Sequence, residues 1–116
     1  MINHVSFQGR FTKDLELKHT ANNVAYVKFT LAWSEKYGEK ETSCFLNCVA
    51  YKSNADFLSK YFHKGDMVLV EGKLLTRSYE DQKGKQWITE LIVDKSHFCG
   101  SKRNDKLDDD ETVLPF

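Results

Sequence analysis

The segment that most constrains the fold is residues 24–34 (VAYVKFTLAWS), in which apolar and polar side chains alternate. Successive side chains of a strand point to opposite faces, so this period of two predicts a strand. One face carries Val27, Phe29, Leu31 and Trp33, and the other carries Lys28, Thr30, Ala32 and Ser34. A strand with one apolar face must pack against another layer of the same fold. The segment therefore predicts a sheet that covers a core.

Four further segments have strand-like patterns, namely residues 3–11, 44–51, 67–79 and 86–98. Gly9 and Gly72 interrupt two of them and indicate bulges or tight bends. A helix is predicted from Ser53, which resembles an N-cap with Asp56 three residues later, to the lysine and glycine at 64–65. The charged segment 35–43 is predicted to be an exposed loop, and residues 80–85 a turn.

The order of elements is three strands, one helix and two strands within 116 residues. An antiparallel five-stranded barrel with one helix between strands three and four is typical of the OB-fold, an all-β class. We expect this domain to occupy residues 1–99. Residues 100–116 have no period and mixed charge, so we expect a disordered linker that ends in an acidic tip.

The composition argues against several classes of function. The three cysteines form no C-x-x-C pair and the four histidines have no ligand spacing, so no metal or other cofactor is expected. Cys44 and Cys48 lie in an apolar stretch and are predicted to be buried or half-buried thiols. We find no catalytic motif, no signal-peptide pattern and no apolar run long enough for a membrane span, which favours a non-catalytic protein of the cytoplasm.

Several predicted strands place an aromatic ring near a lysine or arginine, a combination that suits single-stranded nucleic acid because rings stack on bases and cations contact phosphates. Tyr37 and Tyr79 flank polar segments and are expected to be exposed, whereas Phe45 and Tyr51 could face either side. Trp33 is assigned to the core or a subunit interface, whereas the pattern does not decide whether Trp87 is buried or exposed. The rings predicted to be core are Phe7, Phe11, Phe29 and Phe62.

With these residues in place, the chain resembles the bacterial and phage single-stranded DNA-binding (SSB) proteins over nearly its whole length. The resemblance is carried, in order, by NHVSFQGRFTKDLELKHT, VAYVKFTLA, FLNCVAYKSNADFLSKYFHKGD, VEGKLLTRSYEDQKGKQ and the acidic ending in LPF. The sequence departs from the family at Leu15, where proline is usual, at His4, where a cation is frequent, and at Asn23, where glycine is common.

The resemblance implies base stacking by Tyr37, Phe45, Tyr51 and Tyr79, and phosphate contacts by Arg10, Lys13, Lys73 and Arg77. Trp87 joins the stacking candidates, and Lys52 and Lys85 join the phosphate candidates, because each ring has a cation beside it. The resemblance also implies a protein that coats and protects single-stranded DNA during replication, recombination and repair. A homotetramer is expected, with a dimer as the alternative.

The chain ends in DDDETVLPF, which resembles the acidic tip by which the family recruits DNA replication and repair proteins. The residues assigned to partner binding are Asp108, Asp109, Asp110, Leu114, Pro115 and Phe116. Thr112 and Val113 separate the acids from the apolar end, unlike the family's contiguous form, so weaker partner binding is expected. The short linker suggests a phage or mobile-element origin.

Two other functions fit the same residues. One is an OB module for RNA or for replication restart, which the acidic tip disfavours. The other is an adaptor that binds only proteins and uses the exposed aromatic rings as its interface. Binding to single-stranded DNA remains the leading hypothesis.

Overall fold

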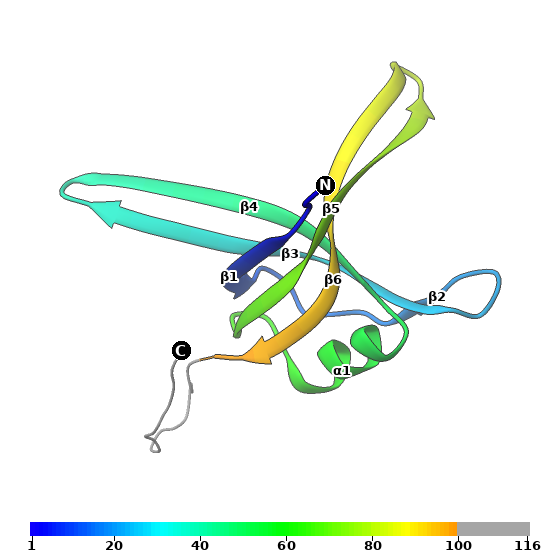
Figure 1. The fold of residues 1–116 in the computed structure, drawn as a ribbon, viewed down its shortest axis with the longest axis horizontal. Helices are drawn as coiled ribbons and strands as arrows, with labels where there is room; N and C mark the ends of the chain where they lie inside the picture. The colour runs from blue at the N-terminus through cyan, green and yellow to red at the C-terminus, as the bar shows by residue number, and fades with distance from the viewer. Residues whose placement is uncertain (100–116) are drawn as a thin grey trace.

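The computed structural model describes residues 1–99 and shows a small β-barrel from which two long hairpins project (Figure 1). The elements follow one another as β1 (Val5–Phe11), β2 (Lys18–His19), β3 (Ala25–Tyr37), β4 (Lys40–Tyr51), α1 (Ser53–Tyr61), β5 (Met67–Asp81) and β6 (Gly84–Phe98). The predicted order of five long strands with one helix after the third is confirmed. The two-residue strand β2, which pairs with Ala25 and Tyr26, was not predicted.

The barrel closes through β1, which pairs with strands on both of its sides. The sheet order is β1-β5-β6-β4-β3-β2, and β1 also pairs with β3 through Arg10 opposite Ala32 and Phe11 opposite Leu31. All these pairings are antiparallel except the short parallel contact between β4 and β6. The predicted OB-fold barrel is therefore confirmed.

The core lies inside the barrel and is capped by α1. Phe11 is 5.1 Å from Phe29 and 5.4 Å from Phe62 between ring centroids, so three of the four predicted core rings form one cluster. Phe7 is half-buried and packs against the edge of this cluster. Burying one such side chain stabilises the fold by about 1.5–3 kcal/mol. The other buried core residues are Val27, Leu31, Cys48, Ala50, Ala55, Leu58, Val68, Val70, Leu91 and Val93.

Two glycines lie where neighbouring backbones come closest. The register of β5 against β6 shifts between Glu71 and Gly72, which confirms the predicted bulge. A Cβ on Gly72 would overlap the carbonyl oxygen of Ile92. At Gly9, a Cβ would lie 2.7 Å from the carbonyl oxygen of Ala32 on β3. Both positions therefore require a residue without a side chain.

The helix begins at Ser53 as predicted, but the predicted N-cap was wrong by one residue. Lys52, not Ser53, is the N-cap, with φ of 58° and no side-chain capping hydrogen bond, and its carbonyl accepts from the Asp56 N–H. The helix ends at Tyr61 and not at the predicted glycine, because Phe62 is extended and enters the core. Within residues 1–99, no helix is long and apolar enough to cross a membrane.

The two charged segments predicted as loops are mostly strand. β3 continues to Tyr37 and β4 begins at Lys40, so only two residues turn the chain, with Gly38 at φ of 65°. In the same way, β5 continues to Asp81 and β6 begins at Gly84. These parts of the hairpins lie outside the barrel, as Figure 1 shows, and are exposed on both faces. They need no apolar face, so alternation does not reveal them.

The cysteines differ in their surroundings. Cys44 is exposed, which corrects the prediction of a buried or half-buried thiol, because its part of β4 has left the barrel. Cys48 is buried, as predicted, and Cys99 is half-buried. Burial, with a smaller contribution from the Glu90 carboxylate, raises the pKa of the Cys48 thiol to about 12. Cys48 is therefore a packing residue and a poor nucleophile.

Replacing Gly72 by alanine is expected to destabilise the barrel strongly, because the new methyl group meets backbone that cannot move aside. We expect the free energy of unfolding to fall by about 3 kcal/mol, the upper end of the usual cost of overpacking. Denaturant titration followed by circular dichroism measures this change. Thr42→Ala, on the exposed part of β4, is the control and should change stability little. Equal stability of the two variants would contradict the close approach.

Cys48 should be unreactive in the folded protein. In a variant with Cys44→Ser and Cys99→Ser, Cys48 is the single thiol, and at pH 8 only about one molecule in ten thousand would carry the reactive thiolate. A thiol-specific chromogenic reagent should therefore react only after unfolding in guanidinium. A variant that keeps Cys44 alone should react at once. Rapid labelling of Cys48 without denaturant would refute its burial.

Candidate nucleic-acid interface

The pairing of β3 with β4 assigns each side chain of this hairpin to a face. Tyr26 is opposite Tyr51, Thr30 is opposite Asn47, and Ala32 is opposite Phe45, on the face that points away from the core. Phe45 is 65% exposed and Tyr51 40% exposed. Both rings are therefore on the solvent side, which resolves the two alternatives that alternation left open.

The opposite face of the same hairpin runs from the core out to solvent. Val27 and Phe29 are buried within the barrel, and Leu46 and Trp33 farther along are half-buried. Trp33 is opposite Cys44 in the register. Tyr37 lies at the far end of β3 and is 85% exposed, as predicted, although it belongs to a strand and not to a loop.

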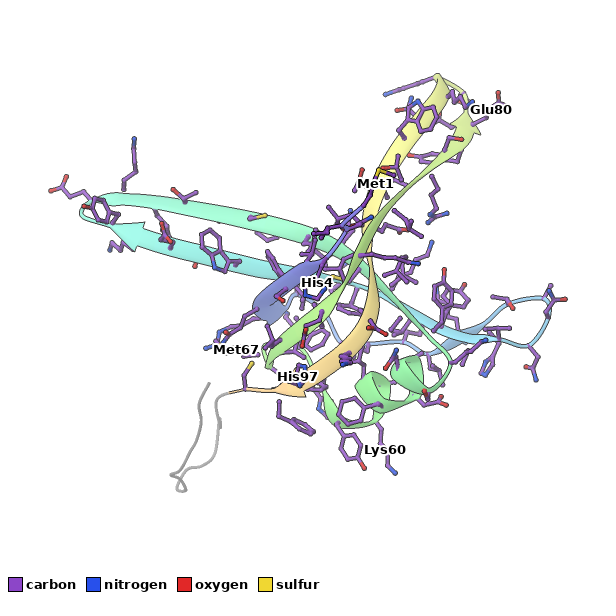
Figure 2. All side chains as sticks on the ribbon, viewed as in Figure 1. Met1, His4, Lys60, Met67, Glu80 and His97 are labelled. Carbon is purple, nitrogen blue, oxygen red and sulfur yellow. The ribbon has the colours of Figure 1, made fainter. Side chains whose placement is uncertain are left out.

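The β5–β6 hairpin separates two of the predicted stacking residues. Tyr79 is opposite Gln86 and Arg77 is opposite Ile88, so these four share one face. Trp87 is opposite Ser78, and Lys85 is opposite Glu80, on the other face. The Lys85 ammonium is 5.1 Å from the centre of the Trp87 ring, so this pair forms its own exposed cation–π contact. The tip of this hairpin is marked by Glu80 in Figure 2.

A groove of about 490 Å³ lies between the first loop, β3, β4 and the β5–β6 hairpin. Its cations are Lys13, Lys18, Lys28 and Arg77, and its carboxylates are Asp14, Glu16 and Glu90. The other lining residues are Thr12, Tyr26, Phe29, Thr30, Asn47, Cys48 and Ile88. The groove thus combines a tyrosine ring, polar groups and several cations on the outer face of the barrel.

Arg77 is held by a buried carboxylate at the base of this groove. Its Nε donates to Oε1 of Glu90 at 2.8 Å and its Nη2 donates to Oε2 at 3.2 Å. The Glu90 side chain is 7% exposed and that of Arg77 is 51% exposed. The hydrogen bond and the charge of Glu90 raise the pKa of Arg77, with small contributions from Tyr51 and Tyr79. Arg77 is therefore an ion-paired residue whose side chain is about half exposed and lines the groove.

The other predicted phosphate residues lie in several places. Lys13 lines the groove with Arg77, and exposed Lys52 caps α1 next to Tyr51. Lys73 lines a separate depression with His4 and Asp94. Arg10 donates to the carbonyl oxygen of Gly65 at 3.0 Å and lines a third depression that Phe45 and Trp33 share. Lys85 lies on the opposite face of its hairpin.

The sequence reasoning missed three residues of this surface. The ring centroid of Tyr26 is 6.4 Å from that of Tyr51. Tyr26 lies on the same face of β3 as Lys28 and Thr30, and this alternation could have identified it as a residue of the outer face. Asn47 and Glu90 gave no such signal, because their partners come from other strands. The tip residues 108–116 lie outside the described residues. Among residues 1–99, no cluster of three or more His, Cys, Asp or Glu side chains is arranged to hold a metal ion.

Comparison with known proteins agrees with this geometry. The model of the Single-strand binding protein family matches residues 2–99. The chain is 37% identical to "Single-stranded DNA-binding protein 1" of Streptococcus pyogenes over 109 residues, which cover 90% of this chain and 83% of the relative. It is 40% identical to "Single-stranded DNA-binding protein" of Bacillus cereus over 103 residues, which cover 84% of this chain but only 60% of that protein.

A solved structure described as "Plasmodium falciparum SSB complex with ssDNA" superimposes with a TM-score of 0.74 at 27% identity. The match covers 84% of this chain and 92% of the other. The fold, the family match over residues 2–99 and these relatives lead to one conclusion. This chain belongs to the single-strand binding protein family.

Proposed function

We propose that the protein binds single-stranded DNA and coats it without catalysing a reaction. The observation that carries the proposal is that Phe45, Tyr51 and Tyr79 are exposed on the β3–β4 and β5–β6 hairpins, and that Arg77, on the same face as Tyr79, lines a groove with three lysines. Rings on which any base can stack, combined with cations for phosphates, give binding that tolerates all sequences. The names of the relatives support the same ligand.

The charge of the groove fits a single strand bound mainly by stacking. Arg77 and Glu90 neutralise each other, which leaves three lysines against Asp14 and Glu16. Asp14 also accepts a hydrogen bond from the backbone N–H of Lys64 and so has a structural role. The groove is therefore only mildly basic, and stacking supplies the larger part of the affinity. We expect a shallow decrease of affinity with salt, because few phosphates are neutralised.

The proposal extends to assembly and partners. We propose a homotetramer, with a dimer as the alternative, that protects DNA during replication, recombination and repair. Partner proteins would bind the tip residues Asp108–Asp110 and Leu114–Phe116. On the partner, a basic rim would contact the aspartates, and an apolar pocket would bind the ring of the terminal phenylalanine. The proposed setting is the bacterial cytoplasm, and the proposed origin is a phage or mobile element.

Removing the stacking rings should weaken DNA binding. With Tyr51→Ala or Tyr79→Ala, we expect the Kd for (dT)15 to rise about 5- to 100-fold, since one stacked ring contributes about 1–3 kcal/mol. Quenching of tryptophan fluorescence measures the Kd, and both tryptophans stay in place. Tyr61→Ala is the matched control, because Tyr61 is 50% exposed but lies on α1 and not on the hairpins that carry the stacking candidates.

Three controls make this experiment decisive. Light scattering shows whether each variant keeps the mass of the parent, so that loss of assembly is distinguished from loss of stacking. A duplex of the same length tests the preference for single strands, and (rU)15 tests the preference for DNA over RNA. Unchanged affinity in both tyrosine variants, tighter binding to duplex, or failure of assembly with unchanged DNA affinity would each refute the proposal.

Deleting Phe116 should separate the two proposed activities. We expect the shortened chain to bind (dT)15 as the full chain does, and to lose the capture of DNA-processing proteins from a bacterial extract. The physical reason is that the terminal ring and its carboxylate are the part proposed to enter the partner's pocket. Asp105→Asn, which removes one charge upstream of the tip, is the control. Loss of DNA binding on deletion would argue against separate sites.

A further inference from the structure

Three aromatic rings lie together where α1 meets the end of β6. Phe57 and Tyr61 are four positions apart and so lie on one face of α1. Phe98, the last residue of β6, has its ring centroid 5.5 Å from that of Phe57 and 6.0 Å from that of Tyr61. The Phe98 ring also stacks at 5.1 Å on Phe62, which is buried in the core. We call Phe57, Tyr61 and Phe98 the aromatic patch.

The aromatic patch is open to solvent and has no part in the proposed DNA binding. Tyr61 is 50% exposed and Phe98 is 63% exposed, whereas Phe57 is half-buried. The other exposed rings within residues 1–99 are the stacking candidates. Adjacent exposed rings bordered by polar residues are typical of a surface that binds a protein segment. The patch therefore indicates a second binding surface.

The border of the aromatic patch is positively charged. The Lys60 ammonium, labelled in Figure 2, lies 5.4 Å from the centre of the Tyr61 ring. Residues 52–65, from the N-cap of α1 to the glycine after the helix, contain Lys52, Lys60 and Lys64 and a single carboxylate, Asp56. A segment that carries carboxylates next to apolar side chains would match this surface in both charge and polarity.

The chain itself contains such a segment. Asp108–Glu111 are four consecutive acids, and the apolar residues Leu114–Phe116 follow them. Leu114 is 16 positions after Phe98 in the sequence. A flexible segment of that length spans about 20–24 Å, so its end can return to the patch. The tether also holds the local concentration of Leu114–Phe116 at the patch on the order of 1 mM.

We propose that Leu114–Phe116 dock on the aromatic patch of the same chain, with the preceding acids beside Lys60. The leucine and phenylalanine side chains cover the exposed rings and are removed from water there. Pro115 limits the conformational freedom that docking takes away.

The spacing between the acids and the apolar residues fits this arrangement. Thr112 and Val113 separate the two groups, and two extended residues span about 7 Å. That length is close to the 5.4 Å between the Lys60 ammonium and the centre of the Tyr61 ring. The acids can therefore contact Lys60 while the apolar residues cover the rings. The two-residue spacer that departs from the family's contiguous form thus suits a surface of this chain.

The docking is independent of DNA binding, because the patch lies on α1 and at the barrel end of β6. It does affect the proposed recruitment of partners. A partner that binds Leu114–Phe116 must first displace them from the patch, so the full chain would bind partners more weakly than its tip alone does. That consequence rests on the proposed function of the tip, whereas the docking itself does not.

A spin label near the tip tests the docking. Cys44→Ser, Cys99→Ser and Thr112→Cys together place one reactive thiol at position 112, since Cys48 is buried. A nitroxide on that thiol broadens the NMR signals of the backbone amides near it. The spectra are recorded on the full chain without DNA.

Docking predicts broadening at the aromatic patch that depends on the apolar residues of the tip. We expect the Phe98 amide signal to be at least about twofold weaker than in a matched chain with Leu114→Ser and Phe116→Ser, because a contact with a Kd of about 1 mM is occupied about half of the time at the tethered concentration. The amides of Gly38 and Gly84, in the turns of the two hairpins, should give equal signals in both chains.

Variants of the surface test whether the patch is the docking site. Tyr61→Ala removes a ring and Lys60→Glu reverses the charge beside it, and each should restore the Phe98 signal. Tyr37→Ala and Lys40→Glu make the same changes at the tip of the β3–β4 hairpin and should leave the broadening as it is. Circular dichroism confirms that each variant is folded, and the exposed Lys60 provides a test that does not alter the packing of the rings.

Three results would overturn the docking. One is equal broadening with and without Leu114 and Phe116, and another is unchanged broadening in both patch variants. The third is broadening between copies, which is measured by refolding spin-labelled chains together with isotope-labelled chains that lack the nitroxide, and which would assign the patch to the tip of a neighbouring copy. Because no sample contains DNA, these results leave the proposed DNA binding standing, and failure to bind DNA would leave the docking standing.

Discussion

Closure of the barrel is the constraint on which the rest of the structure depends. β1 has only seven residues, yet it pairs with β5 along its length and with β3 at its end. Such closure needs backbone to lie almost on backbone, and this is why Gly9 and Gly72 occur where a Cβ would meet the carbonyl of a neighbouring strand. Once the barrel is closed, β3–β4 and β5–β6 are too long to end within it and must project beyond the core (Figure 1).

Alternation could predict the strands only where they cover this core. Between Val27 and Leu31 every second residue is buried, so the period of two is plain in the sequence. Beyond Trp33 the same strand has solvent on both sides, and its residues through Tyr37 are all exposed. Apolar and polar side chains therefore need not alternate there. The hairpin tips were therefore taken for loops, and Cys44 was taken for a buried residue. Only the cross-strand register shows that Trp87 and Tyr79 point to opposite sides.

Some features of the candidate site could likewise be predicted from the sequence, and others could not. Exposed rings such as Phe45 and Tyr51 could be predicted from the resemblance, because each is a property of one strand. The contacts that orient the groove could not, since Arg77 and Glu90 lie 13 positions apart and Thr30 and Asn47 lie 17 apart. Neither separation follows a local period. Each pair depends on the register of one hairpin, β3 with β4 or β5 with β6, and the barrel brings the two hairpins together where β4 pairs with β6.

The pairing of Arg77 with Glu90 also determines how substitutions at Arg77 must be interpreted. A carboxylate with a side chain 7% exposed is costly to bury, the more so in a groove proposed to bind a polyanion, and the guanidinium compensates it through two hydrogen bonds. Removing Arg77 would therefore leave an unpaired buried charge that repels phosphate and destabilises the strand that carries it. Lysine would restore the charge but not the two-pronged geometry. A loss of affinity on changing Arg77 thus measures the effect of the unpaired Glu90 charge together with any lost phosphate contact. Only a double substitution with Glu90→Gln separates the two.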